Sequence, residues 1–168
     1  MRKLLPILLC LLASSSALLA GAPQPSSNLQ QTLSAAAEQK KLGFILLGRP
    51  TCSICNETRT MIEEGKIPVT ATSYVMADLN IDDPKVHAEF MRKYGKEDFG
   101  NTLPFVVVTD SHGTALASSG GYKDAEQWKK LLRSAKAKSD KTTAAANNGG
   151  STAGTDPNWP FKSAPAKQ

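Results

Sequence analysis

A short apolar run followed by two closely spaced cysteines places the strongest constraint on how this chain folds. Residues 44–47 are continuously apolar, which is typical of a strand covered on both faces of its sheet. Cys52 and Cys55 follow this run, and residues 55–65 have the pattern of a helix closed by a glycine. A buried strand that leads directly into a helix predicts an α/β domain with the two cysteines at the junction.

The rest of the central region alternates between helical and strand-like patterns. Asp83 followed by Pro84 is a typical helix start, and Phe90, Met91 and Tyr94 share the expected inward face of that helix. Residues 110–113 form a tight-turn sequence, so the strands on either side of it should make an antiparallel hairpin. We expect further helices over residues 28–41, 83–95 and 124–135, and further strands over residues 73–79, 105–109 and 115–118. The predicted fold is a central mixed β-sheet flanked by helices, in one domain spanning residues 23–138.

The N-terminal residues 1–22 have the layout of a secretory signal peptide: a positively charged start, an apolar run and a series of small residues. An uncleaved membrane anchor is the alternative interpretation. Pro6 and three serines interrupt a stretch that needs about 20 mostly apolar residues to span a bilayer. We therefore expect a periplasmic or extracellular protein without a stable membrane anchor after cleavage, with Ala17, Ala20 and Ala22 all open as the last residue removed.

The C-terminal residues 139–168 are a low-complexity sequence that contains too few apolar residues to bury a core. We predict that this tail is disordered. Residues 157–161, Pro-Asn-Trp-Pro-Phe, place two aromatic side chains among prolines within it. This patch is either a docking motif or part of a plain spacer.

The charge and the histidines exclude several classes of function. The formal net charge is +5, but Lys and Arg equal Asp and Glu in number between Pro23 and Arg133, so no nucleic-acid footprint is indicated. A zinc site needs about four ligands. Besides the two cysteines the central region offers only His87, in a predicted helix, and His112, in a distant turn. We expect a monomer without a metal site or another cofactor.

The position of Cys52 and Cys55 indicates redox chemistry. Cleavage of the signal peptide removes Cys10 and leaves only these two cysteines, and a bridge across two residues closes too small a loop to add much stability. Cys52 should lie at the N-cap of the helix, where unpaired N–H groups and the helix dipole favour a thiolate and lower its pKa. Cys52 would then attack a substrate disulfide, and Cys55 would resolve the mixed disulfide.

The sequence Pro50-Thr51-Cys52-Ser53-Ile54-Cys55 between a strand and a helix, with Thr102-Leu103-Pro104 before a later strand, resembles the thioredoxin family. The resemblance covers roughly residues 29–135. It implies a thioredoxin-like fold in which Pro104 is a cis-proline facing the cysteines. It also implies that Thr102, Leu103 and Pro104 bind an extended substrate peptide through the Leu103 backbone. The alternative is a proline that merely begins a strand.

Several positions depart from the family pattern. The usual Gly-Pro between the cysteines is replaced by Ser53-Ile54, and Leu46 replaces the buried aspartate of the preceding strand. Asp78 occupies the position of the lysine that partners this aspartate. We hypothesise that Asp78 acts as a proton relay and supplies the missing carboxylate from the neighbouring strand; a surface aspartate without a role is the alternative.

The sequence therefore predicts an exported thiol:disulfide oxidoreductase. Its partners would be protein thiols and disulfides and an unidentified redox partner, with the direction of exchange left open. The alternative is a non-catalytic binding module with a permanent Cys52–Cys55 disulfide.

Overall fold

The computed structural model describes residues 21–148, which form a five-stranded sheet with helices on both faces. The strands stand in the order β1-β3-β2-β4-β5; β1, β3 and β2 are parallel, and β4 and β5 are antiparallel to their neighbours. The strands are β1 (Pro25–Ser26), β2 (Leu42–Gly48), β3 (Tyr74–Asn80), β4 (Phe105–Thr109) and β5 (Ala115–Gly120). The helices are α1 (Leu29–Gln39), α2 (Ser53–Glu63), α3 (Pro84–Tyr94) and α4 (Ala125–Asn148). The predicted mixed sheet flanked by helices is confirmed.

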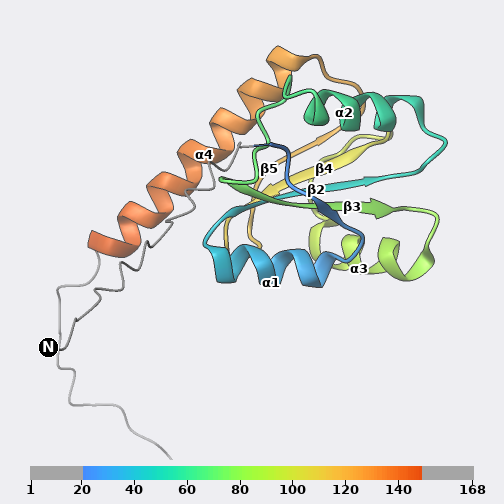
Figure 1. Cartoon of the computed structure of the whole chain (residues 1–168). Coiled ribbons are helices and arrows are strands. Elements are labelled where there is room, and N and C mark those ends of the chain that lie inside the picture. The colour runs from blue at the N-terminus through green and yellow to red at the C-terminus, as the bar shows by residue number, and fades with distance from the viewer. Residues whose placement is uncertain (1–20, 149–168) are drawn as a thin grey trace, which may run out of the picture.

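Two hydrophobic cores lie on opposite faces of the sheet. Helices α2 and α4 cover one face, and α1 and α3 cover the other (Figure 1). Successive side chains of β2 alternate between the faces: Phe44 and Leu46 pack with Trp128 of α4, whereas Ile45 and Leu47 pack with Phe90 of α3. These side chains are all fully buried, so β2 is the central strand that the continuous apolar run predicts.

Helix α3 begins and ends where the sequence predicts. The Asp83 side chain accepts hydrogen bonds from the Lys85 and Val86 N–H groups, Pro84 occupies the first turn, and Gly95 is the C-cap. The prediction that Met91 faces inward is wrong, because its side chain is 38% exposed. Each helical residue is turned by about 100° from the one before, so Met91 is rotated away from the buried Phe90.

An aromatic cluster holds the segment between α3 and β4 against the core. Phe99 is buried and its ring stacks on that of Phe105, with centroids 5.1 Å apart. Tyr94 is buried beside Phe90 and donates its hydroxyl to the Gly113 carbonyl at 3.1 Å. Burial raises the pKa of Tyr94, and the nearby carboxylates of the chain raise it further. The segment that leads to Pro104 is therefore anchored by an aromatic side chain.

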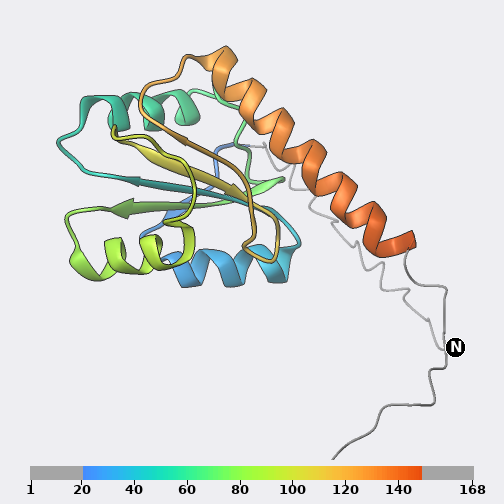
Figure 2. The same ribbon diagram turned by 180° about the vertical axis from the view of Figure 1, so that it is seen from behind.

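Helix α4 is longer than the sequence predicts. It continues past residue 135 and past the predicted domain end at residue 138 to Asn148, and it projects beyond the sheet (Figure 2). Its first half is fixed by Trp128, Leu132 and Ala135, which are buried. The prediction of a disordered tail is wrong for residues 139–148, because a helix that is already formed and anchored over Trp128 to Ala135 is extended at little cost per residue, and the three alanines at 144–146 favour its continuation.

The remaining terminal predictions lie outside the described residues. These are residues 1–20 of the predicted signal peptide and residues 149–168, with the aromatic patch at 157–161. Among residues 21–148, no helix combines the length and the apolar character needed to cross a membrane.

Candidate active site

The two cysteines lie at the start of α2, directly after the central strand. A tight turn is closed by the Cys52 N–H, which donates to the Arg49 carbonyl at 3.2 Å. Cys52 is the N-cap of α2, and its Sγ accepts a hydrogen bond from the Cys55 N–H at 3.2 Å. The two residues form a disulfide with their Cα atoms 5.2 Å apart. The predicted N-cap position of Cys52 is confirmed.

The two cysteine residues differ in exposure. Cys52 is partly exposed, whereas Cys55 is fully buried. Cys55 lies on the inner face of α2 with Thr58 and Ile62, three and seven residues further along, and these are also buried. A substrate that approaches from solvent therefore reaches Cys52 before Cys55.

Gly48, the last residue of β2, makes room for the buried sulfur. A Cβ atom on Gly48 would lie 2.9 Å from the Cys55 Sγ and 3.2 Å from its Cβ, which is closer than packed atoms tolerate. Gly48 is not among the site residues that the sequence predicts. The available signal was a glycine at the end of an otherwise apolar strand, which often marks a close approach to another group.

The segment 102–104 lies at the same end of the sheet as the cysteines. The antiparallel register pairs Leu47 with Phe105, so the next step of that register places Pro104 opposite Gly48. The Leu103–Pro104 bond is cis, and the Pro104 carbonyl accepts a hydrogen bond from the Gly121 N–H at 3.1 Å. The predicted cis bond is confirmed. Binding of a substrate peptide by Thr102, Leu103 and Pro104 stays a prediction.

Asp78 is part of a half-buried ion pair. In the register of β2 and β3 it lies beside Leu46. Its two carboxylate oxygens accept hydrogen bonds from the Arg59 Nε at 2.7 Å and Nη2 at 2.8 Å, and the two side chains are 25% and 21% exposed. Asp78 is therefore not an unpartnered surface aspartate, and its role in proton transfer stays a hypothesis.

The same arginine links Asp78 to the turn that carries Cys52. The Arg59 Nη1 donates to the Asn56 Oδ1 at 2.6 Å, and the Asn56 Nδ2 donates to the Pro50 carbonyl at 2.9 Å. A chain of hydrogen bonds thus runs from β3 across α2 to the residue two before Cys52. Arg59 and Asn56 cannot be predicted as site residues from the sequence, because polar residues on a helix surface carry no signal of the strand that they contact.

The sequence matches no protein-family model and no curated protein, but solved structures match the fold. A thioredoxin-like protein from Clostridium perfringens is similar over 73% of this chain and 89% of its own, at 16% identity and a TM-score of 0.51. A single-residue mutant of thioredoxin from Halobacterium salinarum is similar over 67% of this chain and 89% of its own, at 16% identity and a TM-score of 0.51. Malassezia sympodialis thioredoxin is similar over 68% of this chain and 92% of its own, at 14% identity and a TM-score of 0.50.

This chain has a thioredoxin-like fold. The resemblance predicted from Cys52, Cys55 and Pro104 is confirmed at the level of the fold. Within this thioredoxin-like fold, the Cys52–Cys55 disulfide spans the first turn of the helix that follows the central strand. The arrangement is consistent with thiol:disulfide exchange.

A second ion pair, besides Arg59–Asp78, lies near this thioredoxin-like site. The Arg49 Nη2 lies 3.0 Å from the Asp82 Oδ1, and both side chains are about half exposed, at 45% and 52%. Among the described residues, no three His, Cys, Asp or Glu side chains are grouped so that they could hold a metal ion. His87 lies on α3 and His112 in the turn between β4 and β5.

Proposed function

We propose that this protein is an exported thiol:disulfide oxidoreductase in which Cys52 is the nucleophile and Cys55 the resolving cysteine. The observation that carries the proposal is the unequal exposure of one disulfide, with Cys52 partly exposed at the N-cap of α2 and Cys55 buried. A bridge with a structural role alone does not need one accessible sulfur. Disulfide exchange does need one accessible sulfur, because the attacking sulfur must approach the attacked sulfur along the line of the S–S bond that breaks.

In the reducing direction, the Cys52 thiolate attacks one sulfur of a substrate disulfide. The substrate S–S bond breaks, its other sulfur leaves as a thiolate, and a mixed disulfide with Cys52 forms. The Cys55 thiolate then attacks the Cys52 Sγ, which closes the Cys52–Cys55 bond and releases the second substrate sulfur. Two electrons pass to the substrate, and a dithiol redox partner must return them; the oxidising direction is the same sequence in reverse.

The start of α2 supports the role of Cys52 as nucleophile. The Cys55 N–H already points at the Cys52 Sγ, at 3.2 Å, and this donor would stabilise a thiolate formed there. The positive end of the helix dipole acts in the same direction. Both effects favour Cys52 over Cys55 as the attacking thiolate, because Cys55 lies one turn inside the helix in an apolar environment.

The proposed substrate segment lies across from Gly48. An extended peptide beside Thr102, Leu103 and Pro104 would run along the end of the sheet that carries the cysteines. Leu103 is partly exposed, whereas Pro104 is buried. The Leu103 backbone is therefore the group that we expect to pair with the peptide.

An insulin-reduction assay with dithiothreitol tests the proposed function. We expect turnover by the wild-type protein, none by Cys52→Ser, and a trapped mixed disulfide with insulin for Cys55→Ser. Equal inactivity of the wild-type protein and Cys52→Ser would refute the enzyme and favour a binding module with a permanent disulfide.

Asp78→Asn tests the proton-relay hypothesis separately. If Asp78 assists the resolving thiol, this variant slows the second step of exchange and shifts the apparent pKa of Cys55 in the reduced protein. An exchange rate and a Cys55 pKa that match the wild-type values would remove Asp78 from the mechanism without affecting the roles of the cysteines.

Export is tested by the mature N-terminus. Expression of the full chain, cell fractionation and N-terminal sequencing should find the protein outside the cytoplasm. The new N-terminus should follow Ala17, Ala20 or Ala22. An intact Met1 on a membrane-bound protein would favour the anchor instead.

A further inference from the structure

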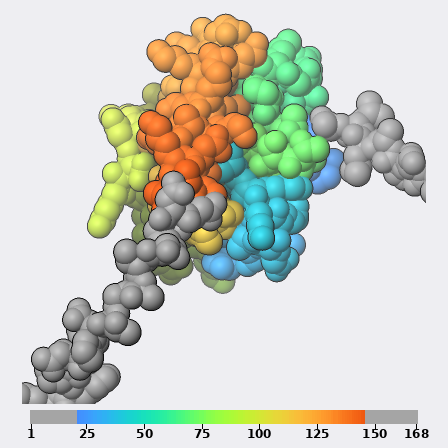
Figure 3. Space-filling view, turned by 90° about the vertical axis from the view of Figure 1, so that its left-hand side faces the viewer, coloured from blue at the N-terminus to red at the C-terminus, as the bar shows by residue number. Residues whose placement is uncertain are grey.

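A cleft of about 630 Å³ lies at the opposite end of β2 from the cysteines. Leu42, the first residue of β2, lines this cleft, whereas Cys52 lies four residues beyond Gly48, the last residue of the strand. One wall is α4, and the other is formed by the junction of α1 with β2 and by the loop before β3. Figure 3 views the molecule from this side, with α4 in orange beside the blue and green surfaces of those segments.

Five of the six charged residues that line this cleft are basic. Lys129, Arg133 and Lys136 contribute from α4, and Lys40 and Lys41 contribute from the opposite wall. Asp140 is the single acidic residue that lines it. Residues 21–148 contain 16 Lys and Arg against 14 Asp and Glu, so five basic residues against one acidic residue in the cleft reflect an uneven distribution of charge and not a strongly basic domain.

Most of these cations have no acidic partner. Lys129 pairs with Glu126 at 2.8 Å. Within residues 21–148, no carboxylate oxygen lies within 4.0 Å of the charged nitrogens of Lys40, Arg133 or Lys136. Like charges placed close together repel one another, and an anionic ligand relieves that repulsion.

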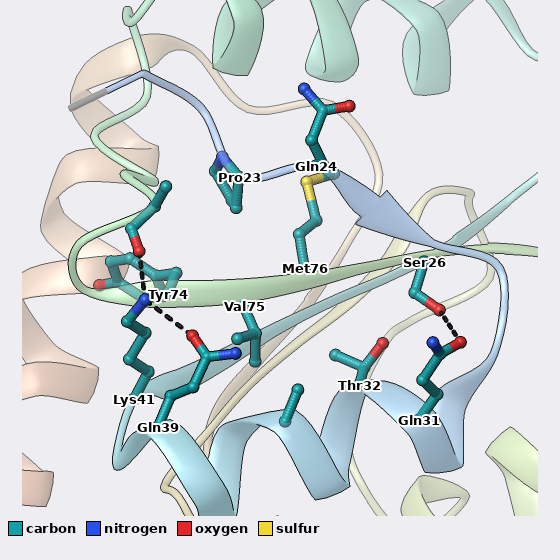
Figure 4. Close-up of a pocket in the computed structure, with 12 residues that line it drawn as sticks. Pro23, Gln24, Ser26, Gln31, Thr32, Gln39, Lys41, Tyr74, Val75 and Met76 are labelled. Carbon is teal, nitrogen blue, oxygen red and sulfur yellow. Dashed lines mark hydrogen bonds between the residues drawn. The ribbon is translucent and has the colours of Figure 1, made fainter. Parts of the chain in front are cut away.

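Lys41 is held in place by neutral acceptors. Its Nζ donates to the Ala71 carbonyl at 2.6 Å and to the Gln39 Oε1 at 2.8 Å, as Figure 4 shows. Neither acceptor carries a charge, so the positive charge of Lys41 is fixed in position but not neutralised. Lys41 also borders the smaller pocket of about 270 Å³ that Figure 4 shows between α1 and β3.

The shape of the cleft indicates what it accommodates. Of its apolar residues, Leu132 and Tyr74 are almost fully buried, at 3% and 6% exposure, whereas Leu42 is partly exposed and Pro68 is exposed. An occupant therefore meets some apolar surface beside the five basic side chains. Two walls with basic residues on both sides enclose a narrow ligand such as a polypeptide segment. A flat bilayer surface would reach only the rim.

We propose that this cleft binds an acidic, extended segment of a partner protein, whose carboxylates pair with Lys40, Arg133 and Lys136. A partner held there leaves Cys52 uncovered, because the cleft and the disulfide lie at opposite ends of β2. Docking and disulfide exchange would thus occur on the same molecule at the same time. The inference stands on the charge distribution and does not require the redox activity.

Fluorescence anisotropy with a labelled peptide of alternating glutamate and serine tests this proposal. We expect the purified full chain to bind the peptide, and Lys136→Glu to weaken binding roughly tenfold. The glutamine version of the peptide should not bind. The matched control is Lys130→Glu, which makes the same charge change on the exposed surface of α4 outside the cleft and should alter binding by less than about twofold.

Other outcomes would overturn the proposal. These are equal weakening by both substitutions, no binding of the acidic peptide, and tighter binding to phosphatidylglycerol vesicles or to single-stranded DNA than to the peptide. Circular dichroism checks that both variants are folded. Peptide binding by Cys52→Ser, which should match that of the wild-type protein, separates a failure of docking from a failure of exchange.

Discussion

The two ends of β2 are built in contrasting ways. At the end that leads to Cys52, side chains are closely packed and paired. Gly48 packs against Cys55, and Arg59 donates two hydrogen bonds to Asp78. At the other end, Lys40 and Lys136 stand without a carboxylate in reach among the described residues. Exchange between two sulfurs requires fixed geometry, whereas recognition of an acidic segment requires accessible charge. One strand thus separates a region of closely packed and paired groups from a region of exposed, unpaired charge, and substitutions at its two ends should have different consequences.

The largest effect should come from Cys52 itself. Cys52→Ser removes the attacking sulfur, so we expect disulfide reduction to fall to the level of dithiothreitol alone in the insulin assay. The fold should persist, because the N-cap position accepts serine well. Disulfide reduction above that level by Cys52→Ser would contradict the assignment of Cys52 as the nucleophile.

Gly48→Ala should destabilise the fold and impair exchange. The added Cβ would meet the Cys55 Sγ at 2.9 Å, and overpacking of this kind costs about 1–3 kcal/mol of unfolding free energy. Urea denaturation measures this cost. In a Cys55→Ala background the sulfur is absent, so Gly48→Ala should lower the free energy of unfolding by less. An equal loss in both backgrounds would mean that the Cys55 sulfur is not the reason for glycine at position 48.

Arg59→Met should have a smaller effect on stability. It leaves the half-buried Asp78 carboxylate without its partner and releases Asn56 from the arginine, and we expect a loss of about 1 kcal/mol together with a changed reactivity of Cys52. A double-mutant cycle with Asp78→Asn measures the coupling. The exposed Lys66–Glu64 pair is the control, since its side chains are 61% and 49% exposed and it should show no measurable coupling. Similar coupling in both pairs would show that the half-buried Arg59–Asp78 pair contributes no more to stability than an exposed pair.

The smallest effect should come from Lys136→Glu. The side chain is exposed on α4, so we expect both the free energy of unfolding and the rate of insulin reduction to change little, by less than about 0.5 kcal/mol for the former. Urea denaturation and the insulin assay measure the two quantities. A marked loss of exchange activity would show that the two ends of β2 are not independent.

The sequence predicted those features that depend on local pattern. The apolar run at Phe44, the cap at Asp83 and the turn at residues 110–113 each specify backbone structure without reference to distant residues, and the structure contains all three. Strand β1 was not predicted, because two residues that pair with β3 carry no periodic signal.

Features that depend on tertiary contacts were missed. The need for glycine at position 48 arises from the Cys55 side chain packed against it, and the role of Arg59 arises from Asp78 on another element. The basic cleft combines Lys40 with Arg133 and Lys136, which are distant in the sequence. Only the fold brings these residues together, so a balanced overall charge concealed their clustering.

Alkylation of the reduced protein tests the central claim most directly, because it reports the unequal roles of the two sulfurs. After reduction, iodoacetamide is applied over a range of pH values and the modified cysteine is identified by peptide mass mapping. We predict that Cys52 is modified first, at pH values below those at which an ordinary thiol reacts, while Cys55 stays protected. Equal modification of both residues, or modification of Cys55 first, would contradict the account.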